Sequence, residues 1–517
     1  MEEKQEQPVH KWLIALSMMT GSLMVGINGS IVNVALPQMR GYLGASVEEI
    51  AWVPTGFILS SVIIMPIVAM LSSRFGRKRF LLFSASLFAL SSMCCGLAWN
   101  LESLIFFRVL QGIGGGPLMP LAQAILRETF PPREQAKAMG IYGFGVILGP
   151  AFAPTLGGWI TDNYSWQWVF FVNVPMAVLN LILVTRFIKD PPYLLRETGR
   201  IDFSGLFFLC LGLGALQIML QRGQQKDWFA SNLIVYLAII AAVGLFLFIR
   251  REWTTEKPAV NIRMLKDLNF ATGTVLVGFL GVAFMGGLFV LPLLLQQLLR
   301  YPAFDSGLAV LPRSMAMAVA MPLSGRLYNR TGPKWLIGTG LFLVAFSFFR
   351  FSRLSLMVGF WDIVFIQLMQ GIGFGAIFVS LSTATLSTID RPQMTTATGL
   401  YNVTQQVAGS FGIAMTATLL SWGQTRNRSM LIQHINVFKE TASGILHNLS
   451  SYFFSKGMDQ AGADQLALKS LEGIVSRQSA MMAYNYIHFL LGLLFLLAIV
   501  LAFIIKDKRL ADFKKAI

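Results

Sequence analysis

The stretches "AMLSSRFGRK" (69–78) and "GRLYNRTGPK" (325–334) decide the fold, because they share the pattern small-x-Leu-x-x-Arg-x-Gly-x-Lys. A second pair, "QGIGGG" (111–116) and "QGIGFG" (370–375), recurs at an offset of 259 residues, close to the 256 of the first pair. Self-similarity at a nearly fixed offset indicates an internally duplicated architecture. The repeat therefore predicts two related halves.

The composition around this repeat is that of a membrane protein. The chain has 517 residues, of which 55% are hydrophobic and only 13% charged, and its mean hydropathy is +0.62. Apolar runs recur that are long enough to cross a hydrocarbon core of about 30 Å as helices. Fourteen spans are predicted, at 12–34, 50–71, 80–98, 104–126, 138–160, 168–188, 203–221, 232–250, 270–297, 305–325, 335–352, 359–386, 396–421 and 480–505.

The basic residues predict the orientation of these spans. An even number of spans puts both termini on one side, and the basic stretches "SSRFGRKR" (72–79), "RETFPPREQAK" (127–137) and "RLYNRTGPK" (326–334) fall on that side. Since Lys and Arg are enriched in cytoplasmic loops, both termini are expected in the cytoplasm. The polar stretch 422–478 then falls on the external side, either as a solvated flap with short helices or as a functional segment.

The spans divide the all-α chain into three parts. Residues 1–190 form a first six-helix half, 191–268 carry two inserted helices, and 269–517 form a second six-helix half with the external loop 422–478. Parallel six-span repeats that rock against each other are an architecture of secondary transporters.

Several other classes of function are excluded by what the sequence lacks. The net charge of +16 is spread between apolar runs rather than gathered in one stripe, which argues against nucleic acid as a partner. No G-x-x-x-x-G-K-[ST] loop occurs, so ATP is not the energy source within this chain. The four histidines and three cysteines show no catalytic or metal-ligand spacing, so we expect no enzyme activity, no metal and no cofactor.

Five stretches together resemble the fourteen-helix drug:proton antiporters of the major facilitator superfamily, most closely the EmrB type. They are "INGSIVNVALP" (27–37), "IFFRVLQGIGGGPLMPL" (105–121), "GVILGPAFAPTLGG" (145–158), "DNYSWQWVFFVNVP" (162–175) and "LQIMLQRGQQKDWFAS" (216–231). The resemblance implies a bacterial inner-membrane exporter of hydrophobic, often cationic, drugs that is driven by protons. It also implies a periplasmic EmrA-like adaptor and an outer-membrane channel as partners.

Two motifs gain a role from this resemblance. The antiporter motif of the fifth span maps to Gly145, Gly149, Pro150, Gly157 and Gly158, and we expect Gly149 and Pro150 at a helix bend between the halves, although ordinary small-residue packing explains glycines as well.

The loop that latches the halves in the family maps to Arg74, Gly76, Arg77 and Lys78. Ser73 stands where the family has an aspartate, so the latch should be weaker, and plain anchoring by positive charge is an equal alternative.

Asn28, Asn33 and Arg108 are polar residues within apolar runs. A buried arginine is tolerated in a membrane only beside a cavity or a partner, unless it snorkels to the surface, and in the family the residue matching Arg108 is linked to proton coupling. Asn28 stands where the family commonly has an aspartate, and an amide cannot titrate. Proton coupling then either lies elsewhere or is absent, unless the chain was altered to hold one state, because no Asp or Glu falls confidently in mid-membrane.

The remaining candidates line a predicted central cavity for bulky apolar substrates. They are Gln123, Phe284, Gln296, Gln297, Gln367, Gln370 and Phe378, each of which is alternatively a packing residue. The sequence thus predicts a secondary exporter of hydrophobic or cationic compounds. Two alternatives stay open: an exporter of one endogenous metabolite, lipid or siderophore, and a membrane scaffold or sensor that transports nothing.

Overall fold

The computed structural model describes residues 11–190, 202–255, 258, 260–434 and 440–505, and within them the chain is helical. Thirteen helices or pairs of consecutive helices are long and apolar enough to cross a membrane. The fourteenth predicted span, 396–421, lies in α17 (Met394–His434), which is longer than any span needs but carries more polar side chains. The protein is therefore an all-helical polytopic membrane protein.

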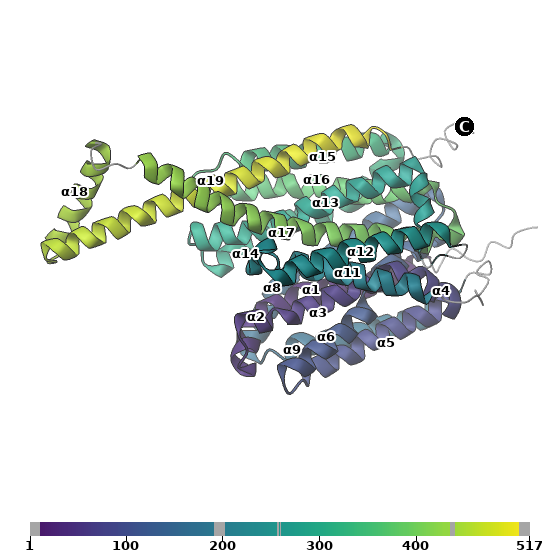
Figure 1. The fold of residues 1–517 in the computed structure, drawn as a ribbon. Coiled ribbons are helices and arrows are strands. Elements are labelled where there is room, and N and C mark those ends of the chain that lie inside the picture. The colour runs from purple at the N-terminus through teal and green to yellow at the C-terminus, as the bar shows by residue number, and fades with distance from the viewer. Residues whose placement is uncertain (1–10, 191–201, 256–257, 259, 435–439, 506–517) are drawn as a thin grey trace, which may run out of the picture.

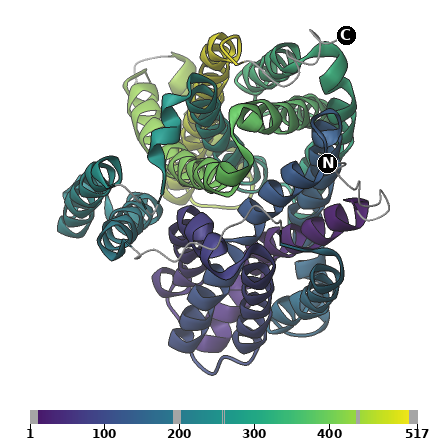
Figure 2. The same cartoon turned by 90° about the vertical axis from the view of Figure 1, so that its right-hand side faces the viewer.

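The first ten helices form one bundle, drawn in purple and blue in Figure 2. Short helices continue one another in two rods: α3 runs through a 3-10 turn into α4, and α6 gives way to α7 where Pro117 follows three glycines. The bounds are α1 Lys11–Leu43, α2 Val47–Ile50, α3 Trp52–Ile64, α4 Val68–Phe75, α5 Arg77–Gly96, α6 Leu101–Gly115, α7 Leu118–Thr129, α8 Pro132–Asn163, α9 Trp168–Phe171 and α10 Asn173–Phe187.

The last seven helices form the second bundle, in teal, green and yellow (Figure 2). Between the bundles in the chain, α11 (Phe203–Arg222) and α12 (Asn232–Thr254) pair with each other, and α11 contacts α3 of the first bundle and α17 of the second. The other bounds are α13 Leu268–Leu293, α14 Ala303–Thr331, α15 Pro333–Phe351, α16 Phe360–Thr385, α18 Glu440–Ser455 and α19 Gln460–Ala502.

The repeated stretches 69–78 and 325–334 have a similar backbone conformation at their glycine. Gly76 separates α4 from α5 with φ +85° and ψ 145°, and Gly332 separates α14 from α15 with φ +82° and ψ 163°. Both positive φ values favour glycine. The glycine in each copy therefore allows the chain to leave one helix and start the next within a single residue.

The two ends of the molecule differ (Figure 1). Lys11 at the start of α1 lies 2.7 Å from Glu134 at the start of α8, and the C-terminal end of α19 lies at this same end, which we call the Lys11 end. At the opposite end, the α18 end, α17 and α19 project beyond the bundle and carry α18.

The stretch 422–478 was expected as an external loop, either a solvated flap with short helices or a functional segment, and it is largely helical. The described part consists of the last turns of α17, the whole of α18 and the first half of α19, while residues 435–439 lie outside the described residues. Asn427 donates to the backbone oxygen of Ser479 at 3.3 Å, and Arg428 pairs with Glu472 at 2.7 Å. The polar composition that indicated a loop belongs to two paired helices that leave the apolar bundle.

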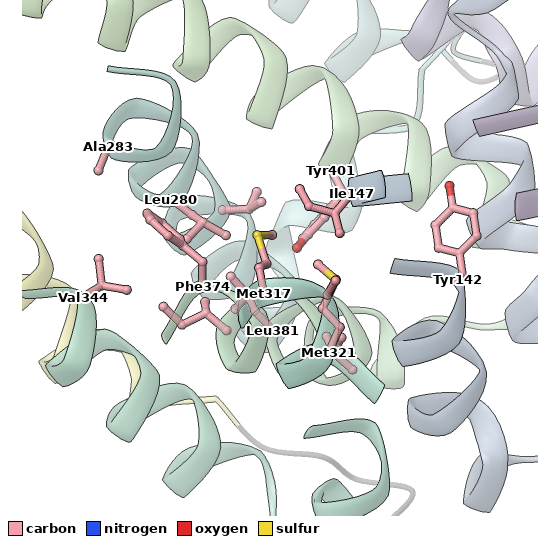
Figure 3. Close-up of a cluster of buried hydrophobic side chains, with 14 of the residues drawn as sticks. Tyr142, Ile147, Leu280, Ala283, Met317, Met321, Val344, Phe374, Leu381 and Tyr401 are labelled. Atoms are coloured by element: carbon pink, nitrogen blue, oxygen red, sulfur yellow. The ribbon is translucent and has the colours of Figure 1, made fainter. Parts of the chain in front are cut away.

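Apolar side chains from both halves meet in one continuous core (Figure 3). Tyr142 and Ile147 on α8 belong to the same buried cluster as Met317 and Met321 on α14 and Tyr401 on α17. Flexible methionines fill irregular gaps and re-pack easily. The interface between the halves is therefore suited to sliding contact.

Candidate functional site

A polar cluster lies inside the first half, around the middle of α1. Asn28 is completely buried, and its Oδ1 accepts a hydrogen bond from Nη1 of Arg108 on α6 at 3.2 Å. The same Nη1 donates to Oε1 of Gln111 at 2.7 Å, and Nε of Arg108 donates to the carbonyl of Val53 at 3.0 Å. Asn173 on α10 donates to Asn28 at 3.5 Å. Arg108 therefore turns into the protein, which corrects the alternative that it snorkels to the surface.

Aromatic faces cover the guanidinium of Arg108. Its central carbon lies 4.5 Å from the ring of Phe57 and 5.8 Å from that of Phe170, and the residue is 1% exposed. Cation–π contacts stabilise such a charge but do not neutralise it. Among the residues that the structure describes, no carboxylate forms an ion pair with Arg108.

The second half contains a buried arginine of the same kind, to which the sequence gave no role. Arg313 on α14 is 3% exposed and donates from Nη1 to Oε1 of Gln370 at 3.4 Å. Its guanidinium lies 5.1 Å from the ring of Phe284. Within the described part of the chain it too has no ion pair with a carboxylate. The signal by which the sequence could have revealed it is a charged residue inside the predicted span 305–325.

The two clusters are related by the internal repeat. The offset of 259 residues maps Arg108 onto Gln367 and Gln111 onto Gln370, and the offset of 256 maps Phe57 onto Arg313. The same 256 maps Asn28 onto Phe284. Each half thus holds one guanidinium against the glutamine of its "QGIG" motif, but the guanidinium comes from α6 in the first half and from α14 in the second.

Of the other predicted pathway residues, Phe284 and Gln370 contact Arg313, and Phe378 packs on Phe284. Phe284 packs edge-to-face on Phe374 and Phe378 with centroids 5.1 and 5.5 Å apart. Gln367 is fully buried. Asn33, Gln296 and Gln297 are exposed; Asn33 bonds its own helix at Gly29, and Gln296 donates to Ser306 at 3.2 Å.

The glycines of the antiporter motif pack α8 against α1, within the first half. A Cβ added at Gly149 would lie 3.0 Å from the backbone nitrogen of Ile27 and 3.0 Å from the backbone oxygen of Leu23. Pro150 lies against Gly26, whereas Gly158 has nothing within 4 Å. The expectation that Gly149 and Pro150 lie between the halves is therefore wrong.

Two further glycines of this motif also face α1. A Cβ added at Gly145 would lie 2.0 Å from the side chain of Met19, and one added at Gly157 would lie 2.8 Å from the side chain of Ile31. Close approach of two helices along several turns is what such a glycine series permits.

Arg77 and Lys78 of the basic loop after α4 make polar contacts within the first half. Arg77 forms an ion pair with Glu128 on α7. The backbone N–H of Lys78 donates to Asp190 at 2.8 Å, and its Nζ donates to the carbonyl of Thr185 at 2.7 Å. Asp190 therefore caps the start of α5 from a distance, and the latch between the halves stays a prediction.

Several polar contacts that join the halves directly lie at the Lys11 end. Arg127 on α7 donates to the carbonyls of Ser382 and Thr383 near the end of α16. Gln123 and Asn402 on α17 exchange two hydrogen bonds, of 3.0 and 3.4 Å.

Beside these contacts, α8 and α14 approach closely through glycines. A Cβ at Gly140 would lie 2.6 Å from the carbonyl oxygen of Met321, and one at Gly325 would lie 2.3 Å from that of Ala136. Asn329 donates to the carbonyl of Arg133 at 2.6 Å. The halves are therefore in tight backbone contact at this end.

Comparisons with known proteins agree with this architecture. Residues 18–413 match the model of the Major Facilitator Superfamily. The chain is 34% identical to the multidrug export protein EmrB of Haemophilus influenzae, covering 86% of this chain and 87% of EmrB. It is 31% identical to the fatty acid resistance protein FarB of Neisseria gonorrhoeae, covering 95% and 96%.

The fold is also that of a solved transporter. The human organic anion transporter MFSD10 aligns with a TM-score of 0.60 over 95% of this chain and 100% of that one, at 13% identity, a likeness of fold alone. The match to the superfamily model and the sequence identity to EmrB and FarB show the family as well as the fold. The chain is a secondary transporter of the major facilitator superfamily and belongs with its EmrB-like exporters.

Proposed function

We propose that this chain exports hydrophobic compounds from the cytoplasm of a bacterium, across the inner membrane, by alternating access. The observation that carries the proposal is the gathering of inter-half hydrogen bonds at the Lys11 end, where Arg127 and Gln123 reach across to the second half. Halves that are joined by polar contacts at one end and by methionine-rich packing further in can part by rocking. If both termini are cytoplasmic, this conformation is closed toward the cytoplasm.

The charges of the bundle bear on the substrate. Every described Asp and Glu lies outside a helix, within its terminal turns, in α2, or in the extension made of α18 and the first half of α19. No described carboxylate is thus in place to bind a cationic drug in mid-membrane, while two guanidinium groups are buried there. Neutral or anionic hydrophobic compounds fit this distribution better than cations.

A second candidate is the export of one lipid-like compound, such as a fatty acid. FarB is named for fatty acid resistance, and the buried arginines favour a substrate with an acidic head group. A panel of competing substrates separates the two: a multidrug exporter accepts unrelated hydrophobic compounds, and a specific one does not.

Protons are the proposed driving ion, although Asn28 occupies the position of the family's aspartate. An amide holds no proton to exchange, so the exchange would use another group or a proton carried by the substrate. Comparing transport with and without an imposed pH gradient tests this part alone.

The extension at the α18 end is the proposed docking site for a periplasmic adaptor that leads to an outer-membrane channel. It stands clear of the bundle (Figure 1), and it exposes Ile445, Tyr452, Phe454 and Leu468. Exposed apolar side chains on a projecting element are typical of a surface for a partner.

Efflux from proteoliposomes tests the proposal as a whole. The full chain is reconstituted, loaded with a neutral hydrophobic dye and compared with empty liposomes, with and without a pH gradient. We expect dye movement that depends on the protein. A scaffold or sensor would move nothing, and that result would overturn the proposal.

A further inference from the structure

The two buried arginines, Arg108 and Arg313, lie at comparable depths in the two halves. Arg108 is seven residues beyond the start of α6 at Leu101, about 10 Å along the helix, and Arg313 is ten residues beyond the start of α14 at Ala303, about 15 Å along it. In a hydrocarbon core of about 30 Å, these positions approach the midplane. Substrate sites of repeat-built transporters lie at that depth, where the repeats meet.

Two amides that contact Arg108, and a third that lies one helical turn from Gln370, offer unused donors. Nδ2 of Asn28, Nε2 of Gln111 and Nε2 of Gln367 are all buried without a hydrogen-bond partner in the described structure. Oδ1 of Asn28 and Oε1 of Gln111 already accept from Arg108, so the donors are what is left over. Gln367 alone also has an unpartnered oxygen. The first cluster thus combines a positive charge with two spare N–H groups, the second has the spare N–H groups of Gln367 one helical turn from the glutamine that Arg313 contacts, and among the described residues neither cluster contains a carboxylate paired with its arginine.

An anion is the ligand that fits such a surplus. It accepts hydrogen bonds without donating any, and a carboxylate pairs with a guanidinium through two parallel bonds. Water would satisfy the amides but would leave the charge unneutralised, which is costly in a medium of low dielectric constant. The aromatic rings of Phe57 and Phe284 beside the guanidiniums provide apolar surface for the rest of the molecule.

We propose that Arg108 and Arg313, each with the glutamine of its "QGIG" motif, form the two parts of a split recognition site for the anionic head group of an amphipathic substrate. The proposal rests on the proposed export function and specifies its substrate class. Both guanidiniums are covered in this conformation by residues of their own half, Phe57 and Phe170 over Arg108 and Phe284 over Arg313, so the head group enters when the helices within each half shift during the cycle. It engages one arginine from each half in the course of the cycle.

Direct binding to the full chain in lipid nanodiscs tests this. The probe is radiolabelled dodecanoate, and the competitors are unlabelled dodecanoate, dodecanol, dodecyltrimethylammonium and sodium chloride. We expect only dodecanoate to compete well. Equal competition by the cation or the alcohol overturns the proposal, and so does displacement by chloride but not by gluconate, which would indicate a site for an inorganic anion.

Substitutions identify the residues. Arg313→Gln and Arg108→Gln are each expected to weaken dodecanoate binding about tenfold or more, the loss expected for a charge-assisted hydrogen bond. Arg326→Gln is the matched control, because it removes one positive charge from the exposed face of the same helix α14. Unchanged binding by Arg313→Gln, or an equal loss in Arg326→Gln, overturns the proposal.

The repeat offers a second test that does not depend on a loss. The double variant Arg313→Phe/Gln367→Arg moves the guanidinium of the second half to the position that Arg108 occupies in the first. We expect it to recover dodecanoate binding relative to Arg313→Phe alone. No recovery of dodecanoate binding in a monodisperse double variant overturns the split site.

The dye assay also separates the two proposals. If the protein exports the neutral dye but Arg313→Gln binds dodecanoate normally, the inference fails and the export function stands. If the protein moves no dye under any condition, the export function itself fails.

Discussion

Replacing Asn28 with aspartate would supply Arg108 with the carboxylate that it lacks. The side-chain oxygen is already 3.2 Å from Nη1 of Arg108, so the new group needs no rearrangement to form an ion pair. The change also removes Nδ2, a buried donor without a partner in the described structure. Asn28→Asp should therefore stabilise this part of the fold, although it places a second charge in the membrane.

The size of the effect follows from the distance. Two unit charges 3.2 Å apart attract each other by about 5 kcal/mol at an effective dielectric constant of about 20. Desolvating the new carboxylate offsets much of this, because burying an ion costs several kcal/mol. The coupling that remains between Asn28→Asp and Arg108 should be about 1–3 kcal/mol, the usual range for side chains in direct contact.

A double-mutant cycle measures that coupling. The apparent melting temperature of the full chain in detergent should rise by about 2–4 °C in Asn28→Asp. It should fall when the same change is made in an Arg108→Gln background, where the carboxylate is buried alone. Dodecanoate binding should weaken in Asn28→Asp because the guanidinium is neutralised, and export should become more dependent on a pH gradient. The same temperature shift in both backgrounds would refute the pairing.

Four further predictions concern other parts of the molecule. Gly149→Leu should abolish transport and lower the melting temperature, because the new side chain meets the backbone of α1. Gly158→Leu is the control and should be tolerated, because open space surrounds Gly158. Equal tolerance of both substitutions would contradict the packing argument. Replacing 430–470 with a short glycine-serine linker should abolish co-purification with an adaptor. The chain should stay monodisperse, because Asn427 and Ser479 keep their hydrogen bond. Unchanged adaptor binding would exclude the extension as the docking site. Arg127→Gln should increase the inward-open population, because it removes hydrogen bonds between the halves. Spin-label distances across the Lys11 end measure this population. Unchanged distances would show that these hydrogen bonds have no role in closure. Burial raises the pKa of Asp202, but hydrogen bonds from Arg251 and from the backbone of Gly205 outweigh this effect and lower the pKa overall. The stabilisation by Asp202 should therefore be present above about pH 4 and be lost as the pH falls further. If the melting temperature of Asp202→Asn falls in acid as steeply as that of the unchanged protein, this cap is not the cause.

The architecture could be predicted because it depends on patterns within the chain. Apolar runs located the spans, and the repeat that contains Gly76 and Gly332 predicted two related halves. The structure of the stretch 422–478 was left open because polarity alone does not distinguish a loop from a helix that leaves the membrane. Its helices pair through contacts such as Arg428 with Glu472, which are 44 residues apart.

The site was harder to predict, because it depends on which helices meet. The sequence marked Asn28 and Arg108 as unusual but did not show that they are partners. Arg313 was passed over since it matches no family motif, and its relation to Arg108 becomes visible only when Gln111 and Gln370 are seen to hold the two guanidiniums. The cap that Asp190 provides to α5 joins residues more than a hundred positions apart, which no local pattern predicts.

The length of α19 has a mechanical consequence. It is one unbroken helix of 43 residues, about 65 Å long, with its C-terminal part inside the second half and its N-terminal part beside α18. A continuous helix transmits rotation as a stiff lever, so the displacement at its tip grows with the distance from the pivot. Each rocking movement of the second half therefore displaces α18, and a partner bound to α18 would be moved once in every transport cycle.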